Sequence, residues 1–497
     1  MTRTSHFPTD AHIPVYSVDF LSDNVVVYAG GGGAGRSGVT NAIVAAHIST
    51  SDQSTTKLHE LKLSRQEDAP MTMAVNSKRR QLVCGINSTP DDIKHGTNRH
   101  LRIFDWSLSS PDDDDKATGK QSQNQSQQPK AEGKITELPS VTIHQAKAES
   151  SLAITDPEQY QKVTRFSHSG RLLAVASTDG KIALQRYPSL AHVWKTSTDE
   201  TNATLAASTS GSASATDPGS STTGVPSQDF KDDEIYDADF SETGSHIVFT
   251  SSSKLVVYST TPRATPDTPQ GGSSPQQRPQ LDGDGDGDGD DDDDSAADEP
   301  GYAQVIQTIK NPALGGKGPC SFRAARFGRG DASRERLFTV VNAAPAGGRG
   351  PKAKIRKSFV TAWDADSWDL IETRHVSDRP VTVFDVSPDG RLLAYGSSDL
   401  SVGVLDAKTL RPLVKILHAH DFPPTTLRFN PSSTLLVSAS ADNTLRIIQV
   451  PTPGSSAGGG GGMGGVEALI QARGGVYLSI LLALIAIVLA LVAQKRF

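Results

Sequence analysis

Short apolar stretches separated by polar turns recur along most of the chain. Each unit contains an apolar residue that ends one strand, a polar turn, a run of apolar residues and a further strand in which apolar and polar residues alternate. Alternation with a period of two predicts half-buried β-strands. The stretches 383–409 and 426–450 show the pattern most clearly, and Val386 in the first matches Phe429 in the second, 43 positions later. A period of about 40–45 residues is typical of WD-type repeats, in which each repeat forms one propeller blade.

Seven residues hold this same register, each at the end of the first strand of a unit: Phe20, Val75, Phe166, Phe240, Phe327, Val386 and Phe429. We therefore predict an all-β fold, a seven-bladed WD-type β-propeller over residues 11–450. The spacing between anchors exceeds one period where the chain is rich in Ser, Gln, Asp, Pro and Gly, a composition that lacks the apolar area needed to offset the entropy of ordering. We predict disordered surface insertions at 107–150, 196–228, 261–300 and 343–354.

The end of the chain has a different pattern. Residues 476–493 read VYLSILLALIAIVLALVA, without a charged residue, and Lys495 and Arg496 follow. At 1.5 Å per residue this stretch covers about 27 Å as a helix, which suits the bilayer of the endoplasmic reticulum. The sequence thus predicts a Gly-rich linker at 451–475, a single C-terminal transmembrane helix at 476–493 and a lumenal tail at 494–497. The first residues contain no apolar core of a secretory signal, so we expect the propeller in the cytosol.

The charge and cysteine content limit the classes of partner and the cellular compartment. The formal net charge is −7, but nine aspartates lie between Asp282 and Asp294, and the remainder of the chain sums to about +2. This balance gives no clustered basic face, so we expect no nucleic-acid partner. The two cysteines, Cys84 and Cys320, are too few for a disulfide framework and fit a reducing compartment.

The last repeat contains one candidate for acid–base chemistry. His420, Ser440 and Asp442 have the spacing of the trio that forms a hydrogen-bonded structural brace in WD repeats. A catalytic His–Asp pair is the alternative, but no matched nucleophile accompanies these residues. The brace explains the spacing better.

A glycine-rich segment in the first unit does not fit a simple blade turn. After the apolar strand the chain reads AGGGGAGRSGVTNAIVAAHI over residues 29–48. Residues 30–37 match a phosphate-binding loop if Arg36 replaces lysine, and residues 33–38 match G-x-G-x-x-G. Both motifs require a helix directly after the loop, whereas residues 39–48 are rich in β-branched side chains and predict a strand. A flexible hairpin without a binding role is a second interpretation.

The third interpretation rests on resemblance. Four glycines at Gly30, Gly31, Gly32 and Gly33, then Gly38 and Asn41 before the next strand, together with the propeller pattern and the C-terminal span, resemble the Sec-type COPII guanine-nucleotide exchange factor family. That family has a cytosolic WD-like propeller with one C-terminal membrane span, and its first-blade glycine loop holds a potassium ion and contacts the GTPase. The resemblance implies a potassium loop formed by Gly30, Gly31, Gly32, Gly33 and Asn41. It also implies a GTPase-contacting loop formed by Gly38, Val39, Thr40 and Asn41.

The function implied by this resemblance is exchange without covalent chemistry. We expect a guanine-nucleotide exchange factor for a Sar-type small GTPase at the endoplasmic reticulum membrane, which promotes GDP release and GTP loading and so starts COPII vesicle coat assembly. No small-molecule substrate is expected. The alternative is a membrane-tethered WD-repeat scaffold without exchange activity.

Overall fold

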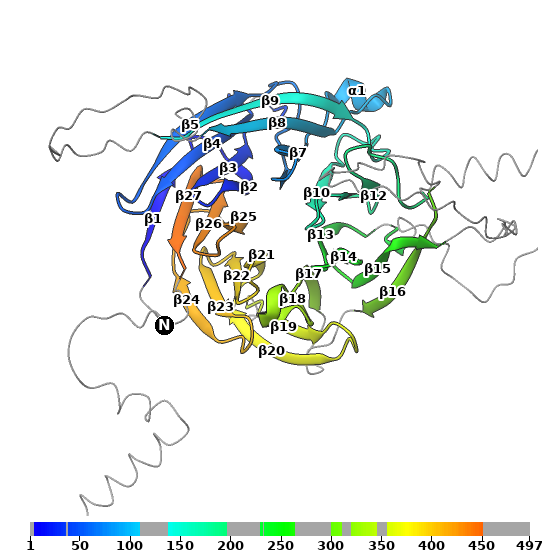
Figure 1. Ribbon diagram of the computed structural model, residues 1–497, viewed down its shortest axis with the longest axis vertical. Helices are drawn as coiled ribbons and strands as arrows, with labels where there is room; N and C mark the ends of the chain where they lie inside the picture. The colour runs from blue at the N-terminus through cyan, green and yellow to red at the C-terminus, as the bar shows by residue number, and fades with distance from the viewer. Residues whose placement is uncertain are drawn as a thin grey trace, which may run out of the picture. The chain divides into compact units, whose positions relative to one another are not determined.

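The computed structural model describes residues 4–35, 38–109, 138–195, 229–231, 233–263, 300–310, 320–344 and 355–450. Within these ranges seven antiparallel sheets surround a common centre (Figure 1). The predicted all-β, seven-bladed propeller is therefore confirmed. No helix among the described residues is long and apolar enough to cross a membrane, and the predicted span at 476–493 lies outside them.

Each blade follows the chain from an inner strand to an outer one. Blade 1 contains β2 (Val15–Ser22), β3 (Val25–Gly30), β4 (Ala42–Ser49) and β5 (Ser54–Lys62). Blade 2 contains β6 (Thr72–Asn76), β7 (Gln81–Gly85), β8 (Leu101–Ser109) and β9 (Ser140–Glu149). Blade 3 contains β10 (Gln161–Phe166), β11 (Leu172–Ser177) and β12 (Ile182–Arg186), and blade 4 contains β13 (Ile235–Phe240), β14 (His246–Ser251), β15 (Lys254–Arg263) and β16 (Tyr302–Lys310).

The second half of the ring is built in the same way. Blade 5 contains β17 (Cys320–Phe327), β18 (Arg336–Ala343), β19 (Ser358–Asp364) and β20 (Leu370–Ser377), and blade 6 contains β21 (Val381–Val386), β22 (Leu392–Ser397), β23 (Val402–Asp406) and β24 (Pro412–Ile416). Blade 7 contains β25 (Pro424–Phe429), β26 (Leu435–Ser440), β27 (Thr444–Gln449) and, from the other end of the chain, β1 (His6–Asp10). Among the described residues, two short helices, α1 (Pro90–Lys94) and α5 (Gly330–Ser333), lie in connections between strands.

Strand β1 closes the ring. It pairs antiparallel with β27, from His6 opposite Ile448 to Asp10 opposite Thr444, so the first and last strands share one blade. The predicted propeller range of 11–450 leaves this strand out. Pairing with β27 covers an edge that would otherwise expose unsatisfied backbone groups.

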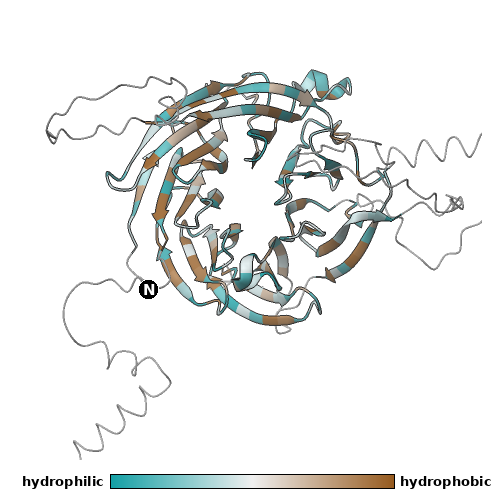
Figure 2. Cartoon of the chain, viewed as in Figure 1, coloured by the Kyte–Doolittle hydropathy of each residue, from teal (hydrophilic) through white to brown (hydrophobic). Residues whose placement is uncertain are grey.

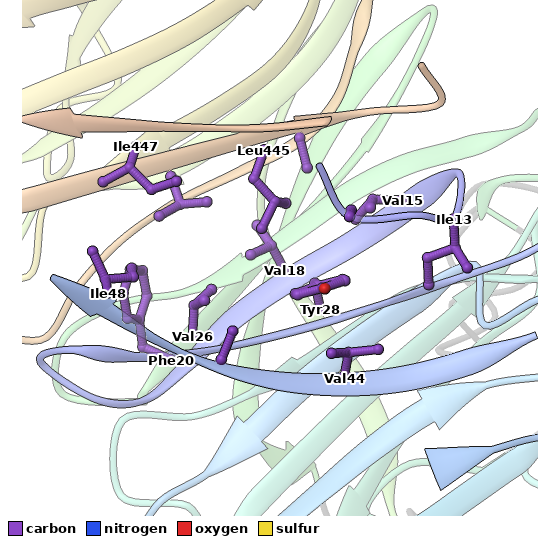
Figure 3. Close-up of a cluster of buried hydrophobic side chains, with 14 of the residues drawn as sticks. Ile13, Val15, Val18, Phe20, Val26, Tyr28, Val44, Ile48, Leu445 and Ile447 are labelled. Carbon is purple, nitrogen blue, oxygen red and sulfur yellow. The ribbon is translucent and has the colours of Figure 1, made fainter. Parts of the chain in front are cut away.

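The alternation seen in the sequence appears as alternating brown and teal positions along the strands (Figure 2). Apolar side chains from neighbouring blades meet between the sheets. Figure 3 shows one such cluster, in which Val18 and Tyr28 of blade 1 pack with Leu445 and Ile447 of blade 7. Full burial of one such side chain contributes about 1.5–3 kcal/mol. The seven anchor residues all lie within the last three positions of the inner strands, as their shared register predicts.

In the structure, strands extend into three of the four predicted insertions. The range 107–150 includes the end of β8 and the whole of β9 (Ser140–Glu149). Strand β9 is an outer strand that exposes much of its surface, and its polar composition therefore looks like a loop in the sequence. Similarly, β15 continues to Arg263 and β18 to Ala343.

Candidate functional site

The glycine-rich segment connects β3 to β4 in blade 1. Gly30 pairs with Val15 at the beginning of β2 on one side and with Ala42 at the beginning of β4 on the other. The segment therefore projects from the end of the propeller at which the inner strands begin. We call this end the glycine-loop rim.

Two of the glycines are required by close backbone approach. A Cβ atom on Gly30 would lie 1.8 Å from the carbonyl oxygen of Pro14. Gly31 has φ +140°, and a Cβ atom there would lie 2.4 Å from Oδ1 of Asn41. The Gly31 N–H donates to the Pro14 carbonyl at 2.9 Å, which fixes this approach. Only glycine fits both positions.

The next glycines have more room. Gly33 has φ +70° and Gly38 has φ +77°, so both adopt the left-handed conformation. A Cβ atom on Gly38 would meet no other atom within 4 Å. These positions need glycine for the backbone path alone, and Gly38 is exposed.

Asn41 holds the loop in place. Its side chain is fully buried, and Oδ1 accepts a hydrogen bond from the Gly33 N–H at 2.9 Å. Its Nδ2 group donates to the carbonyl oxygens of Ser64 at 2.9 Å and Glu67 at 3.0 Å, and the Asp68 carbonyl lies 3.4 Å away. The amide thus ties the glycine-rich segment to the connection between blades 1 and 2.

The remaining residues of the predicted GTPase-contacting loop lie at different depths. Gly38 is exposed, while Val39 and Thr40 are half-buried. Val39 packs against the core cluster between blades 7 and 1, and Thr40 Oγ1 accepts a hydrogen bond from Arg65 at 2.8 Å. Gly38 to Thr40 therefore offer surface to a partner, whereas the buried side chain of Asn41 positions them.

Residues 63–69 are part of this arrangement, and sequence reasoning did not include them. The Glu67 carboxylate forms an ion pair with Arg102 of blade 2 at 2.5 Å, and the Asp68 N–H donates to the Asn87 carbonyl at 3.2 Å. Burial raises the pKa of the Asp68 carboxyl group, while a hydrogen bond from Asn87 opposes that rise. The segment contains no recognisable motif. Its one signal in the sequence is the polar run SRQED at 64–68.

Comparisons with known proteins agree with this architecture. The family described as "WD domain, G-beta repeat" matches residues 411–449. SEC12-like protein 2 of Arabidopsis thaliana is 27% identical over 137 residues, which are 28% of this chain and 32% of that protein. Guanine nucleotide-exchange factor SEC12 of Candida glabrata is 26% identical over 175 residues, which are 32% of this chain and 38% of that protein.

The chain is similar to Sec12-type WD-repeat proteins. The matches span well under half the length of each relative. Among solved structures, Raptor of Chaetomium thermophilum superposes with a TM-score of 0.51 at 12% identity, over 90% of this chain and 28% of that one. At that identity the superposition shows the propeller fold alone.

The Sec12-type resemblance implies a potassium ion, and the chemistry of the loop fits one. Potassium binds carbonyl oxygens, and Oδ1 of Asn41 lies beside Gly31 and Gly33. Among the described residues this oxygen accepts a hydrogen bond from the Gly33 N–H, and an amide oxygen has two lone pairs.

The phosphate-loop interpretation lacks its helix. After the glycine-rich segment the chain enters β4 (Ala42–Ser49), a strand that is paired on both sides. The element that follows the loop therefore supplies no N-terminal helix amides to it. Arg36, which that interpretation requires, lies outside the described residues.

The His420 brace is confirmed with one change of partner. The imidazole contacts Thr444 Oγ1 and Ser438 Oγ, each at 2.8 Å, while Asp442 Oδ2 lies 3.6 Å away. Ser440, the predicted member, instead donates to the carbonyl of Phe422 at 3.0 Å. Side chains alternate along β26, so Ser438 and Ser440 point to the same face and the sequence alone could not choose between them. Burial lowers the pKa of His420 to about 4.

Proposed function

We propose that this protein is a guanine-nucleotide exchange factor for a Sar-type small GTPase, and that the glycine-loop rim is the surface that acts on it. The observation that carries the proposal is the loop of Gly30–Asn41, tied down through the buried Asn41 amide on a propeller similar to Sec12-type proteins. A relative named as a guanine nucleotide-exchange factor supports exchange as the activity. Exchange at the endoplasmic reticulum would start COPII coat assembly.

The mechanism follows from rigidity. A small GTPase holds its nucleotide through magnesium and ordered switch segments. A partner that binds the opened, nucleotide-free switches more tightly must weaken nucleotide binding by the same coupling energy. The anchored loop keeps Gly38 to Thr40 in one position, so it can act on the switches without first losing conformational entropy. No covalent step is needed for this reaction.

A potassium ion would be held by carbonyl oxygens of Gly30–Gly33 and by Oδ1 of Asn41. Its charge would draw these oxygens together and stiffen the loop. The Asn41 hydrogen bonds to Gly33, Ser64 and Glu67 set the loop position from the other side.

The membrane part of the proposal concerns residues outside the described ranges. A single span at 476–493 would hold the propeller at the cytosolic face of the endoplasmic reticulum, where it meets a GTPase on the same membrane. Tethering raises the effective concentration of the two partners without changing the site.

Release of fluorescent GDP from a Sar-type GTPase, measured with and without the full chain, tests the proposal. We expect a substoichiometric amount of the chain to accelerate release, and Asn41→Ala to lose most of the acceleration while the protein remains folded. Binding of the GTPase without any change in release would instead support the scaffold alternative. Replacement of potassium by sodium or lithium should lower the rate of the native protein and should matter less for Asn41→Ala.

A further inference from the structure

The central channel opens at the glycine-loop rim into a cavity of about 440 Å³. The beginnings of the inner strands line it, and the lining residues include Val18 of blade 1 and Met71, which follows the connection at 63–69 in the chain. The glycine loop and this cavity therefore lie at the same end of the propeller. The charged side chains that line the cavity are mostly basic: Lys162, Arg165, Arg323, Arg326, Arg428 and the single carboxylate Asp237.

The deeper cations are neutralised inside the channel. Arg326 forms an ion pair with Asp237, and Arg428 lies 3.2 Å from Asp385. Arg165 lies 3.6 Å from Asp237. Although burial opposes ionisation, Arg428 and other arginines lower the pKa of Asp385 and keep it charged. This layer joins blades 3 to 7 and is structural.

The outer cations are balanced less completely. Lys162 of β10 pairs with the carboxylate of Glu234. Arg323 of β17 has no ion pair within the described part of the chain. Both cations lie over the ring of Tyr236, Lys162 Nζ at 4.6 Å and the Arg323 guanidinium at 5.0 Å from its centre.

Both cations lie over one ring, and among the described residues only Lys162 has a carboxylate within ion-pair distance. Burial lowers the pKa of Lys162, and the nearby Arg323 lowers it further, while Glu234 opposes both effects. Burial also lowers the pKa of Arg323, while the nearby carboxylates of Asp237 and Glu234 oppose that effect. An incoming anion at Arg323 would reduce the repulsion between the two cations and would form charge-assisted hydrogen bonds with the guanidinium.

The surroundings of Arg323 favour a protein as the source of that anion. The cavity is also lined by Tyr16, Tyr160, Met71 and Pro423. Phe422, next to Pro423 in the chain, is 58% exposed. Tyr, Met, Phe and Arg are enriched in protein–protein interfaces, and Tyr and Arg are common energetic hot spots.

We propose that the channel mouth, centred on Arg323 and Lys162, receives an Asp or Glu side chain of the protein partner that docks on the glycine-loop rim. The inference rests on the proposed function in one respect, since that partner is taken to be the Sar-type GTPase. The loop then acts on the switches, while the mouth supplies a charged anchor beside it.

The test measures binding of the GTPase to the full chain by calorimetry, alongside the KM and kcat of exchange, at low and moderate salt. Arg323→Gln should weaken binding and raise KM about tenfold, leave kcat within twofold and flatten the salt dependence, because a partly desolvated charge pair is lost. Arg323→Lys should recover part of the affinity. Glu234→Gln should have the opposite effect and strengthen binding, since it removes the competing carboxylate.

The matched control is Arg171→Gln. Arg171 is an exposed cation that follows the turn after β10, at the opposite end of the propeller, and it should leave binding and KM unchanged. Thermal melting confirms that each variant is folded. Native affinity in folded Arg323→Gln, or weaker binding in Glu234→Gln, would overturn the inference. So would competition by millimolar inorganic phosphate at constant ionic strength, because the mouth would then be a phosphate site.

The two proposals fail in different ways. If the chain binds the GTPase through Arg323 but does not accelerate GDP release, the exchange function is wrong and the anchor stands. If release is accelerated and Arg323→Gln has no effect, the anchor is wrong and the exchange function stands. If the GTPase does not bind at all, both are wrong.

Discussion

Blades 1 and 7 differ in how the segment between their second and third strands is held at the glycine-loop rim. In blade 1 the buried Asn41, at the end of the segment between β3 and β4, bonds to the connection that leads to blade 2. In blade 7 the buried His420, in the connection that comes from blade 6, contacts Ser438 of β26 and Thr444 of β27, on either side of the turn between them. In blade 7 the turn between β26 and β27 contains only residues 441–443, with Asn443 at φ +68°. In blade 1 the corresponding segment contains residues 31–41.

This difference in length distinguishes the residues that a blade needs for its turn from the residues that are available for binding. The short turn of blade 7 shows that closing a blade here needs about three residues, and the His420 contacts hold the turn tightly against the ring. Blade 1 is held through Asn41 and has a longer segment in front of that residue. That extra length, fixed at its base, is what a binding loop on a rigid scaffold requires.

The largest expected effect is at the base of the loop. Gly31→Ala places a Cβ atom 2.5 Å from Cα of Asn41, in a backbone conformation with φ +140° that side chains rarely adopt. We expect a loss of about 3 kcal/mol or more of folding free energy. Asn443→Gly in blade 7 is the comparison, because its positive φ suits glycine, and it should change stability by less than about 1 kcal/mol. Chemical denaturation measures both, and equal effects would break the comparison.

The contribution of His420 to folding stability should depend on pH, whereas that of Asn41 should not. Burial lowers the pKa of His420 from 6.5 to about 4, so the folded state favours the neutral ring. Its contribution is present above pH 6.5 and is lost as the pH falls from 6.5 towards 4, because the unfolded chain takes up the proton first. The shift corresponds to at most about 3 kcal/mol. Unfolding curves of the native protein and His420→Gln should converge as the pH falls through this window, and parallel curves would contradict the assignment.

The Asn41 and His420 contacts should contribute similarly to folding stability but differently to the exchange activity. Asn41→Ala leaves the Gly33 N–H and the carbonyls of Ser64 and Glu67 without their partner, which costs about 1–3 kcal/mol. His420→Ala should have a similar cost through Ser438 and Thr444. We expect only Asn41→Ala to reduce exchange per folded molecule, by tenfold or more. A comparable loss in His420→Ala would mean that exchange responds to general loosening of the rim.

The smallest effect belongs to Gly38→Ala. Nothing lies within 4 Å of the added Cβ atom, and the only strain comes from φ +77°. The expected cost is about 1 kcal/mol. Because Gly38 is exposed beside Val39 and Thr40, the KM of exchange should rise while the melting temperature changes by only a few degrees. An unchanged KM would place the GTPase contact elsewhere.

The sequence predicted the ring well because each blade repeats a local pattern. Phe166, Phe240 and Val386 could be placed at the ends of inner strands from alternation and spacing alone. Strand β9 could not, because an exposed outer strand has little apolar character. Strand β1 was also missed, since its partner β27 lies at the far end of the chain.

The site was predicted less completely for a related reason. Gly30, Gly31 and Asn41 stood out because four consecutive glycines are unusual. The contacts of Asn41 with Ser64 and Glu67 cross more than twenty residues and leave no local signal. The channel mouth is more remote still, because Arg323 and Lys162 meet over one ring only after three different blades have assembled.

Closure by β1 has a consequence for synthesis of the protein. The strand His6–Asp10 is made before the other described strands, and its partner β27 (Thr444–Gln449) follows about 440 residues later. At roughly 5–20 residues per second, the first strand waits about 20–90 seconds for its blade to be completed. During that time the nascent ring is open, and both β1 and the flank of blade 1 facing blade 7 lack their neighbours. Chaperone engagement of the ribosome-bound chain should therefore persist until residue 449 has emerged, and it should not fall stepwise as each blade is finished.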